Sequence, residues 1–341
     1  MVAYKFEFAK IIKNIFIYQK FFIFNDFIQL SIYFSRINFS ISDINMARPK
    51  GKIIVIGGAI DKGSFAESNF EDSVEDNLNL FERGILNKIV TESKHGVDSV
   101  IEIIPTASKI PLIVGDEYMK AFKFLGAKNT NILDIRKRKD AISKDIYDRV
   151  NNADVVFFTG GDQLRLTSII GGTPVHDLIL HKYVHEDFLY VGTSAGAASA
   201  SNSMIYQGSS QEALLKGEIK MTSGFGLIDH VVFDTHFVKR GRIGRLFNSV
   251  SSNPKTLGIG LGEDTGLLIT KGVKMEAIGS GLVILVDGRF IADSNITDVA
   301  LGQQISINNL VVHVLSYGNT YSLKTHELNI RKRIKKSLLV K

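Results

Sequence analysis

Residues 189–200 read Leu-Tyr-Val-Gly-Thr-Ser-Ala-Gly-Ala-Ala-Ser-Ala, so an apolar run ends in Gly-Thr-Ser-Ala-Gly. Tyr190–Thr193 is predicted to be a buried strand, Ser194 a tight turn and Ala195 the start of a helix. Small neighbours let the strand reverse into the helix, which raises the serine Oγ above the sheet with backbone N–H groups facing it. The pattern is that of a nucleophile elbow, and the alternative is a turn packed for close helix–strand contact.

A serine nucleophile needs a base, and the base needs an acid that orients it. His236 follows a predicted strand that ends at Asp234, so it lies at the carboxyl end of a strand, as Ser194 does. Glu263 and Asp264 follow another predicted strand and can lie beside this histidine. Asp234 is the competing candidate for the orienting acid.

Three arginines lie just beyond the candidate base: Arg240, Arg242 and Arg245. A guanidinium group is a planar fork that binds a carboxylate through two hydrogen bonds. The alternative is a solvated helix start. Because the cluster is so close to His236 in the sequence, we favour carboxylate binding by at least one of the three.

The composition excludes several other classes of site. The 341 residues contain no cysteine, so disulfides, thiolate metal sites and a cysteine nucleophile are ruled out. His181 and His185 have a spacing that suits a metal on one helix face, but no third ligand accompanies them, and we interpret them as a helix surface. We expect no metal or organic cofactor. The formal net charge of +6 equals the six Lys and Arg of residues 331–341, so a basic face for nucleic acid is not supported.

Apolar, β-rich runs alternate with helical patterns from Lys52 onward. This alternation predicts an α/β fold with a mostly parallel sheet and helices on both faces. Ligands of such sheets bind at the carboxyl ends of the strands, where Gly57-Gly58, Gly160-Gly161 and Ser194 all lie. Short alternating segments from Leu267 to Leu323 predict antiparallel strands that complete the sheet or form a hairpin cap. The expected strands are 52–56, 99–104, 130–135, 154–158, 190–193 and 230–234, and the expected helices are 78–90, 115–125, 141–150 and 240–250.

The two ends of the chain differ from its centre. Residues 1–45 are dense in Phe, Ile, Tyr, Asn and Lys, and their apolar stretch is interrupted by polar residues, so a stable membrane span is not expected. We interpret them as an extension outside the fold, with Met46 as the working start; a membrane-surface segment is the alternative. Residues 46–328 are expected to form a single catalytic domain, and 329–341 a basic tail. We expect a cytoplasmic protein, or an exported one if residues 1–45 act as an atypical leader.

Between Lys52 and Leu323 the sequence resembles the cyanophycinases, in the group of serine peptidases that includes peptidase E. The resemblance implies an α/β fold similar to that of class I glutamine amidotransferases and flavodoxins. One position departs from the family pattern: Thr235 stands where a glutamine precedes the histidine, which puts part of the substrate contact in doubt. The resemblance is carried by Gly-Gly-Ala at 57–59, Ile-Pro-Thr-Ala-Ser at 104–108, Phe-Thr-Gly-Gly-Asp-Gln at 158–163, the elbow at 192–196, the block 234–245 and Gly-Glu-Asp-Thr at 262–265.

The resemblance also implies roles for individual residues. Ser194 would be the nucleophile, His236 the base and Glu263 its orienting acid. From the residues themselves, we expect the amide of Ala195 and a backbone N–H near Gly160-Gly161, that of Gly161, to bind the oxyanion. Substrate contacts are implied for Gln163, Asp234, Thr235, Arg240, Arg242 and Arg245.

The implied activity is that of a serine exopeptidase. It would hydrolyse cyanophycin, a polyaspartate that carries arginine on each side-chain carboxyl, to β-aspartyl-arginine dipeptides. The alternatives are an aspartyl dipeptidase similar to peptidase E and a non-catalytic protein that binds an acidic ligand. The expected partners are cyanophycin or other β-aspartyl peptides and a second copy of the chain in a homodimer.

Overall fold

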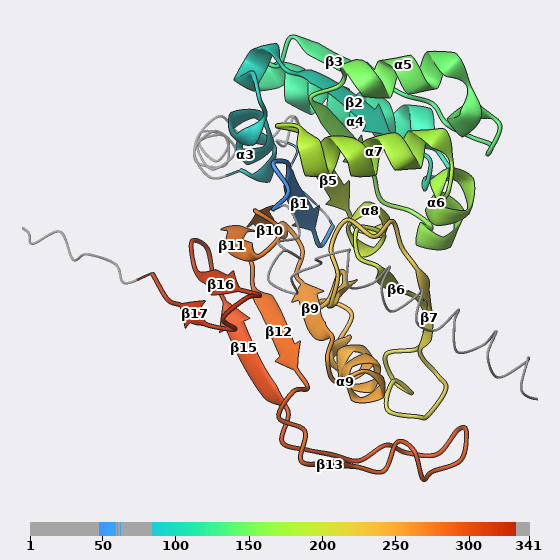
Figure 1. Ribbon diagram of the computed structural model, residues 1–341, viewed down its shortest axis with the longest axis vertical. Helices are drawn as coiled ribbons and strands as arrows, with labels where there is room; N and C mark the ends of the chain where they lie inside the picture. Colours follow the sequence, from blue (N-terminus) through green and yellow to red (C-terminus); the bar gives the residue numbers. More distant parts are fainter. Residues whose placement is uncertain (1–47, 59, 61, 63–83, 332–341) are drawn as a thin grey trace, which may run out of the picture. The chain divides into compact units, whose positions relative to one another are not determined.

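The computed structural model describes residues 48–58, 60, 62 and 84–331, and its central element is a nine-stranded sheet (Figure 1). Five of these strands are parallel, as expected for apolar runs joined by helices. In sheet order they are β1 (Lys52–Ile56), β5 (Leu189–Thr193), β4 (Val155–Phe158), β2 (Val100–Ile104) and β3 (Asn129–Ile132).

Helices cover both faces of the parallel strands. Alternate residues of β1 pack on different faces: Ile54 and Ile56 lie in one apolar cluster, whereas Ile53 and Val55 lie in the other. The first face is covered by α3 (Ile85–Glu92) and α4 (Pro111–Phe124), and the second by α5 (Lys144–Asn152), α6 (Gln163–Ile170) and α7 (Pro174–His185). This arrangement confirms the predicted fold class.

The C-terminal strands are divided between two sheets. On the other side of β1, the central sheet is completed by antiparallel strands: β10 (Thr265–Thr270), β11 (Lys274–Gly279), β16 (Thr320–Ser322) and β17 (Leu328–Asn329). A separate four-stranded sheet has the order β15 (Val311–Leu315), β12 (Val283–Asp287), β9 (Leu257–Leu261), β8 (Val231–Asp234). The prediction of completing strands is therefore confirmed, and the second sheet was not foreseen.

Helix α9 (Ile243–Ser252) packs on the second sheet, with Leu246 and Val250 in a cluster with Val232 and Val286. This helix begins three residues later than the expected residue 240. His236 and Gly241 adopt positive φ angles of 51° and 59°, so the chain forms a separate turn first, closed by a hydrogen bond from the Arg242 amide to Phe237 O.

Three other expected helices differ from the observed ones at their starts. Gly84, inside the expected helix 78–90, is extended, and α3 begins at Ile85. Helix α4 begins at Pro111 rather than at 115, and α5 begins at Lys144 rather than at 141, because the Ser143 side chain caps it by accepting from the Ile146 amide. The remaining short elements are η2 (Gly96–Asp98), η3 (Asp140–Ile142), α8 (Ala195–Ala198), β6 (Ser203–Gln207), β7 (Lys220–Ser223), β13 (Asp293–Ser294) and β14 (Ile307–Asn308).

Some expectations fall outside the described residues: the extension 1–45, the start at Met46, the first part of the helix 78–90 and residues 332–341. Asn329, expected in the tail, lies in β17 and pairs with Thr320 of β16. Within the described part of the chain, no helix has the length and apolar character needed to cross a membrane.

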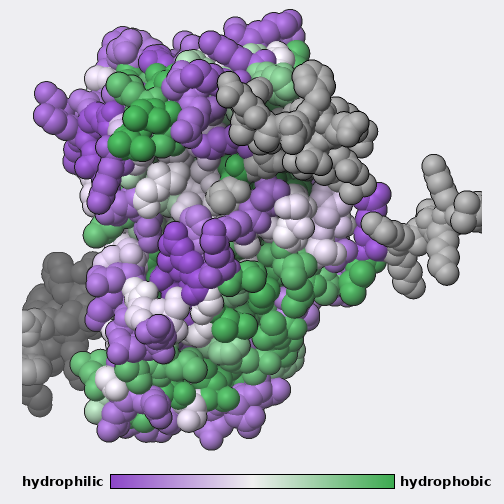
Figure 2. Space-filling model, turned by 180° about the vertical axis from the view of Figure 1, so that it is seen from behind, coloured by the Kyte–Doolittle hydropathy of each residue, from purple (hydrophilic) through white to green (hydrophobic). Residues whose placement is uncertain are grey.

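Strand β15 forms one edge of the second sheet and exposes two valines, Val312 and Val314. Seen from behind, the molecule gathers hydrophobic residues over the lower part of this face (Figure 2). Leu282 and Phe290 are further apolar side chains that are exposed in this C-terminal region. The expected homodimer stays a prediction.

Candidate active site

Ser194 lies at the reversal between β5 and α8, as its neighbours predict. Its backbone φ is 51°, a strained angle for a residue with a side chain, and its amide donates to Ile56 O at 2.9 Å. A Cβ on Gly192 would lie 2.3 Å from the backbone of Gly196, and a Cβ on Gly196 would lie 2.5 Å from Phe158 O. Glycine is therefore required at both positions, and the strand–turn–helix geometry predicted around Ser194 is present.

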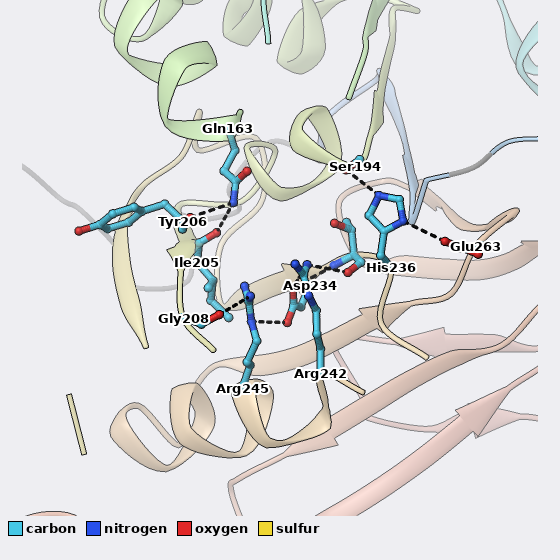
Figure 3. A network of polar contacts seen from close by, with 11 residues as sticks. Gln163, Ser194, Ile205, Tyr206, Gly208, Asp234, His236, Arg242, Arg245 and Glu263 are labelled. Carbon is cyan, nitrogen blue, oxygen red and sulfur yellow. Dashed lines mark hydrogen bonds and ion pairs between the residues drawn. The ribbon is translucent and has the colours of Figure 1, made fainter. Parts of the chain in front are cut away.

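The predicted base and acid lie in line with this serine (Figure 3). Ser194 Oγ is 3.1 Å from His236 Nε2, and His236 Nδ1 is 3.2 Å from Glu263 Oε1. These distances allow a hydrogen-bonded chain from hydroxyl to imidazole to carboxylate, the geometry of a Ser-His-acid triad.

The backbone of Gly57 and Gly58 holds His236 and the Glu263 turn together. The His236 amide donates to Gly57 O, and the Asp264 amide to Gly58 O, both at 2.9 Å. Gly58 has a φ of 114°, and a Cβ there would lie 2.4 Å from His236 Cε1. The imidazole thus occupies the space that any other residue at 58 would fill.

Of the three candidate acids, only Glu263 contacts the histidine in the described residues. The Asp264 carboxylate accepts a hydrogen bond from Ser280 Oγ at 2.6 Å, and Asp234 is ion-paired elsewhere. Glu263 lies between β9 of the second sheet and β10 of the central sheet, and its other oxygen is 3.4 Å from Lys239 Nζ.

The surroundings keep the histidine neutral and the acid charged. Burial lowers the pKa of His236 below its usual 6.5, and the hydrogen bond that His236 Nδ1 donates to Glu263 opposes this shift; the Arg240 and Arg242 cations lower the pKa further. The hydrogen bond with His236, together with the Lys239 charge, lowers the pKa of Glu263. A neutral imidazole beside an ionised carboxylate is the protonation state that a general base needs.

Asp234 forms a buried ion-pair cluster with two of the three arginines. Its side chain is 3% exposed, with Oδ1 at 3.1 Å from an Arg242 nitrogen and Oδ2 at 2.9 Å from Arg245 Nε, although the latter two atoms are not aligned for a hydrogen bond. Arg245, 5% exposed, also donates to Gly208 O, and Arg242 donates to Thr235 O. Direct substrate contact by Asp234 or Arg245 would require this cluster to open.

Arg242 and Arg240 are the members of the predicted arginine set that reach solvent. The Arg242 side chain is 17% exposed, and Arg240 is exposed. Thr235 is buried, and the Gln163 amide donates to the carbonyls of Ile205 and Tyr206 in β6 (Figure 3). Arg245 is therefore buried, Arg242 is partly exposed and Arg240 is exposed.

The Gly160-Gly161 loop lies against Ser194. A Cβ on Gly160 would be 3.3 Å from Ser194 Cβ, and Gly161, with a φ of 143°, packs against Ala107 O. Among the described residues, no backbone hydrogen bond uses the amides of Ala195, Gly160 or Gly161. Donors are thus available beside the serine, as an oxyanion site requires.

The comparisons with known proteins agree with this geometry. Residues 81–276 match the model of peptidase family S51. This chain belongs to that family. Membership makes it a serine-type peptidase, and it confirms the enzyme class and the family inferred from the motifs.

Two relatives of this S51 peptidase are cyanophycinases. The cyanophycinase of Geminocystis herdmanii (strain PCC 6308) is 36% identical over 278 residues, which are 82% of this chain and 96% of that protein. The cyanophycinase of Trichormus variabilis (strain ATCC 29413 / PCC 7937) is 38% identical over 223 residues, 65% of this chain and 75% of that protein. A solved peptidase from an acI-B1 Actinobacterium has the same fold, with a TM-score of 0.56, 18% identity and coverage of 81% and 98% of the two chains.

Two features of the S51 site were not identified from the sequence. Lys239, inside the conspicuous 234–245 block, contacts Glu263, but a lysine in a basic run carries no signal of its partner. Gly58 was recognised only as lying at a strand end, and its close contact with His236 depends on a fold that joins positions far apart in the chain. His181 and His185 lie on α7 with their rings 4.6 Å apart.

Proposed function

We propose that this S51 peptidase hydrolyses cyanophycin and releases β-aspartyl-arginine dipeptides. The observation that carries the proposal is the Ser194–His236–Glu263 chain with its distances of 3.1 and 3.2 Å. The relatives named cyanophycinase, one of which is matched over 96% of its length, support the choice of substrate.

The chemistry follows from the geometry of the three residues. Ser194 Oγ attacks the scissile carbonyl carbon while its proton passes to His236 Nε2, and Glu263 stabilises the imidazolium that forms. The carbonyl oxygen becomes an oxyanion that accepts hydrogen bonds from the Ala195 and Gly161 amides. His236 then gives its proton to the leaving amine, and water releases the acyl group by the same steps in reverse.

The charged groups around the triad suit a substrate with both carboxylates and guanidinium groups. Arg240 and Arg242 face solvent and would bind carboxylates of the arginine-substituted aspartates, and Gln163 would contact the substrate through its amide oxygen. Asp234, Thr235 and Arg245 act through Arg242: its nitrogen is held by Asp234 and by Thr235 O. This assignment replaces direct contact by Asp234 and Arg245, because those two are ion-paired with each other.

We further propose that residues 46–328 are sufficient for this activity, with 1–45 and the basic tail outside the catalytic unit. The cytoplasmic location stays a prediction.

The test is to incubate the full chain, and in parallel the chain started at Met46, with cyanophycin and with Asp–X dipeptides, and to identify the products by mass spectrometry. We expect β-aspartyl-arginine from the polymer with both proteins and none with Ser194→Ala. Hydrolysis of Asp–X dipeptides with the polymer left intact would replace the proposal with an aspartyl dipeptidase.

A matched pair of variants tests the arginine assignment. Arg242→Lys keeps the charge and loses the fork, which should lower kcat/KM on the polymer by about 10-fold or more. Arg289→Lys is the control, because Arg289 pairs in the same way with a buried carboxylate, that of Asp287. Asp287 is the last residue of β12, and β12 runs antiparallel to β9, so this end of β12 lies away from Glu263. Equal kcat/KM for the two variants would remove Arg242 from the substrate site.

A further inference from the structure

The helix that follows Ser194 is too short to be stable by its own hydrogen bonds. Helix α8 has four residues, Ala195–Ala198, and isolated helices of this length are not stable. The Gly196 carbonyl lies at the point where a longer helix would offer it an amide four residues on. That amide, on Ala200, donates to Ala197 O instead, at 3.2 Å.

A tyrosine from the preceding strand supplies the missing donor. The Tyr190 hydroxyl donates to Gly196 O at 2.7 Å, and Ser199 Oγ donates to the same oxygen at 3.0 Å. Tyr190 is 0% exposed and lies in β5, four residues before Ser194. Its hydroxyl therefore joins the strand that ends at the nucleophile to the helix that begins with Ala195.

A row of rings holds this tyrosine in place. Tyr190 packs against Phe158 with ring centroids 5.3 Å apart, and Phe158 against Phe225 at 5.5 Å. His176 packs on Phe225 and contacts its carbonyl at 2.8 Å. Since Phe158 is the last residue of β4, two residues before Gly160, the row also supports the loop beside the serine.

We propose that Tyr190 is a positioning residue for the reaction: its hydroxyl fixes α8 and thereby the serine Oγ and the Ala195 amide. The proposal rests on the proposed role of Ser194 as nucleophile. The strained φ of 51° at Ser194 must be held from both sides. Before the turn the Ser194 amide donates to Ile56 O; after it the Ala198 amide donates to Ser194 O, and Tyr190 and Ser199 donate to Gly196 O.

The chain offers a matched control. Tyr183 on α7 lies in the same apolar cluster and is 3% exposed, but its hydroxyl has no hydrogen-bond partner among the residues that the structure describes. Tyr183→Phe and Tyr190→Phe each remove one buried hydroxyl from the core. Only the second removes a hydrogen-bond donor from a carbonyl of the turn that follows Ser194.

The experiment measures the serine directly. A fluorophosphonate forms an O–P bond to Ser194 Oγ and releases fluoride, so its second-order labelling rate constant reports nucleophile geometry without the polymer substrate. Full-chain Tyr190→Phe should lower this rate constant and kcat by about tenfold or more, since misplacement by a fraction of an ångström is costly, with KM within about twofold. Tyr183→Phe should leave the rate constant, kcat and KM within about twofold of the parent.

Ser199→Ala is the second variant, because it removes the other donor to Gly196 O and leaves the ring row intact. It should lower the labelling rate in the same direction by a smaller factor, and it decides the question if Tyr190→Phe does not fold. Labelling and kcat within about twofold of the parent in Tyr190→Phe, or in Ser199→Ala when Tyr190→Phe does not fold, would overturn the positioning role. If Ser194→Ala kept its peptidase activity, the proposed function itself would fail, and this inference with it.

Discussion

The two regions that meet at the active site are built differently. Ser194 follows a strand whose five residues are all buried, in a parallel sheet covered on both faces. His236 follows β8 in the separate sheet, where buried Asp234 is ion-paired with buried Arg245 and with partly exposed Arg242. Apolar packing and glycines position Ser194, whereas ion pairs surround His236.

The contrast teaches where each region is vulnerable. At the elbow, steric changes matter, because added atoms at Gly192 or Gly196 have no space. Around His236, changes of charge matter, because its pKa depends on Glu263, Arg240 and Arg242. The predictions below test whether the two regions respond in these different ways and whether they act as one site.

The largest effect is expected from the triad itself, which spans both regions. Ser194→Ala and His236→Ala should each lower kcat by about 10³-fold or more, and the double variant should be hardly worse than either, because triad members act as a unit. Steady-state kinetics with thermal melts as the control for folding would check this. Additive losses would show that the two regions do not share one reaction.

Gly58→Ala tests the contact between the two regions, where Gly58 lies against His236. The new Cβ would lie 2.4 Å from His236 Cε1, so the imidazole must move, and kcat should fall by about 10²-fold or more. The control is Gly96→Ala, which places alanine at another positive φ, 57°, where nothing lies within 4 Å. If both variants lost activity equally, backbone strain rather than contact with the imidazole would be the cause.

Gly58 also illustrates what the sequence predicted and what it did not. The strands and the elbow were predictable because buried strands and a small-residue turn are local patterns. The pairing of Ser194 with His236 was predictable as chemistry, and Glu263 was identified through the family resemblance. Contacts between the two sheets were not predictable. No local pattern shows that β8 and β9 belong to a separate sheet or that Asp234 pairs with Arg245.

A smaller effect is expected from Glu263→Gln, which keeps the shape and removes the charge. Turnover should fall by about 10-fold to 10²-fold, because the imidazolium loses its counter-ion. Glu263 raises the pKa of His236, so without it this pKa falls further and the acid limb of kcat/KM moves to lower pH. The Asp264 carboxylate accepts a hydrogen bond from Ser280, so Asp264→Asn should leave both the turnover and the acid limb unchanged. If Asp264→Asn changed them and Glu263→Gln did not, Asp264 would be the orienting acid.

The smallest effect concerns the charge of Arg240, which is exposed and acts on His236 from a distance. The parent should keep activity below pH 6.5, because the base must be neutral and its pKa is lowered. Arg240→Gln removes one cause of the lowering, so the pKa of His236 rises and the acid limb of kcat/KM moves to higher pH. Arg240→Lys keeps the charge and should keep the limb in place, even if it binds substrate less well.

The two substitutions at Arg240 therefore separate its charge from its fork. If the acid limb moves in Arg240→Gln but not in Arg240→Lys, the effect is due to charge. The shift of the limb should then be smaller at high salt, because the Debye length falls from about 10 Å at 0.1 M to about 3 Å at 1 M. A fall in kcat/KM at the pH plateau in both variants assigns substrate binding to the fork. If the limb stayed in place in Arg240→Gln at low salt, the base region would not be tuned by its exposed charges, and the contrast between the two regions would reduce to burial alone.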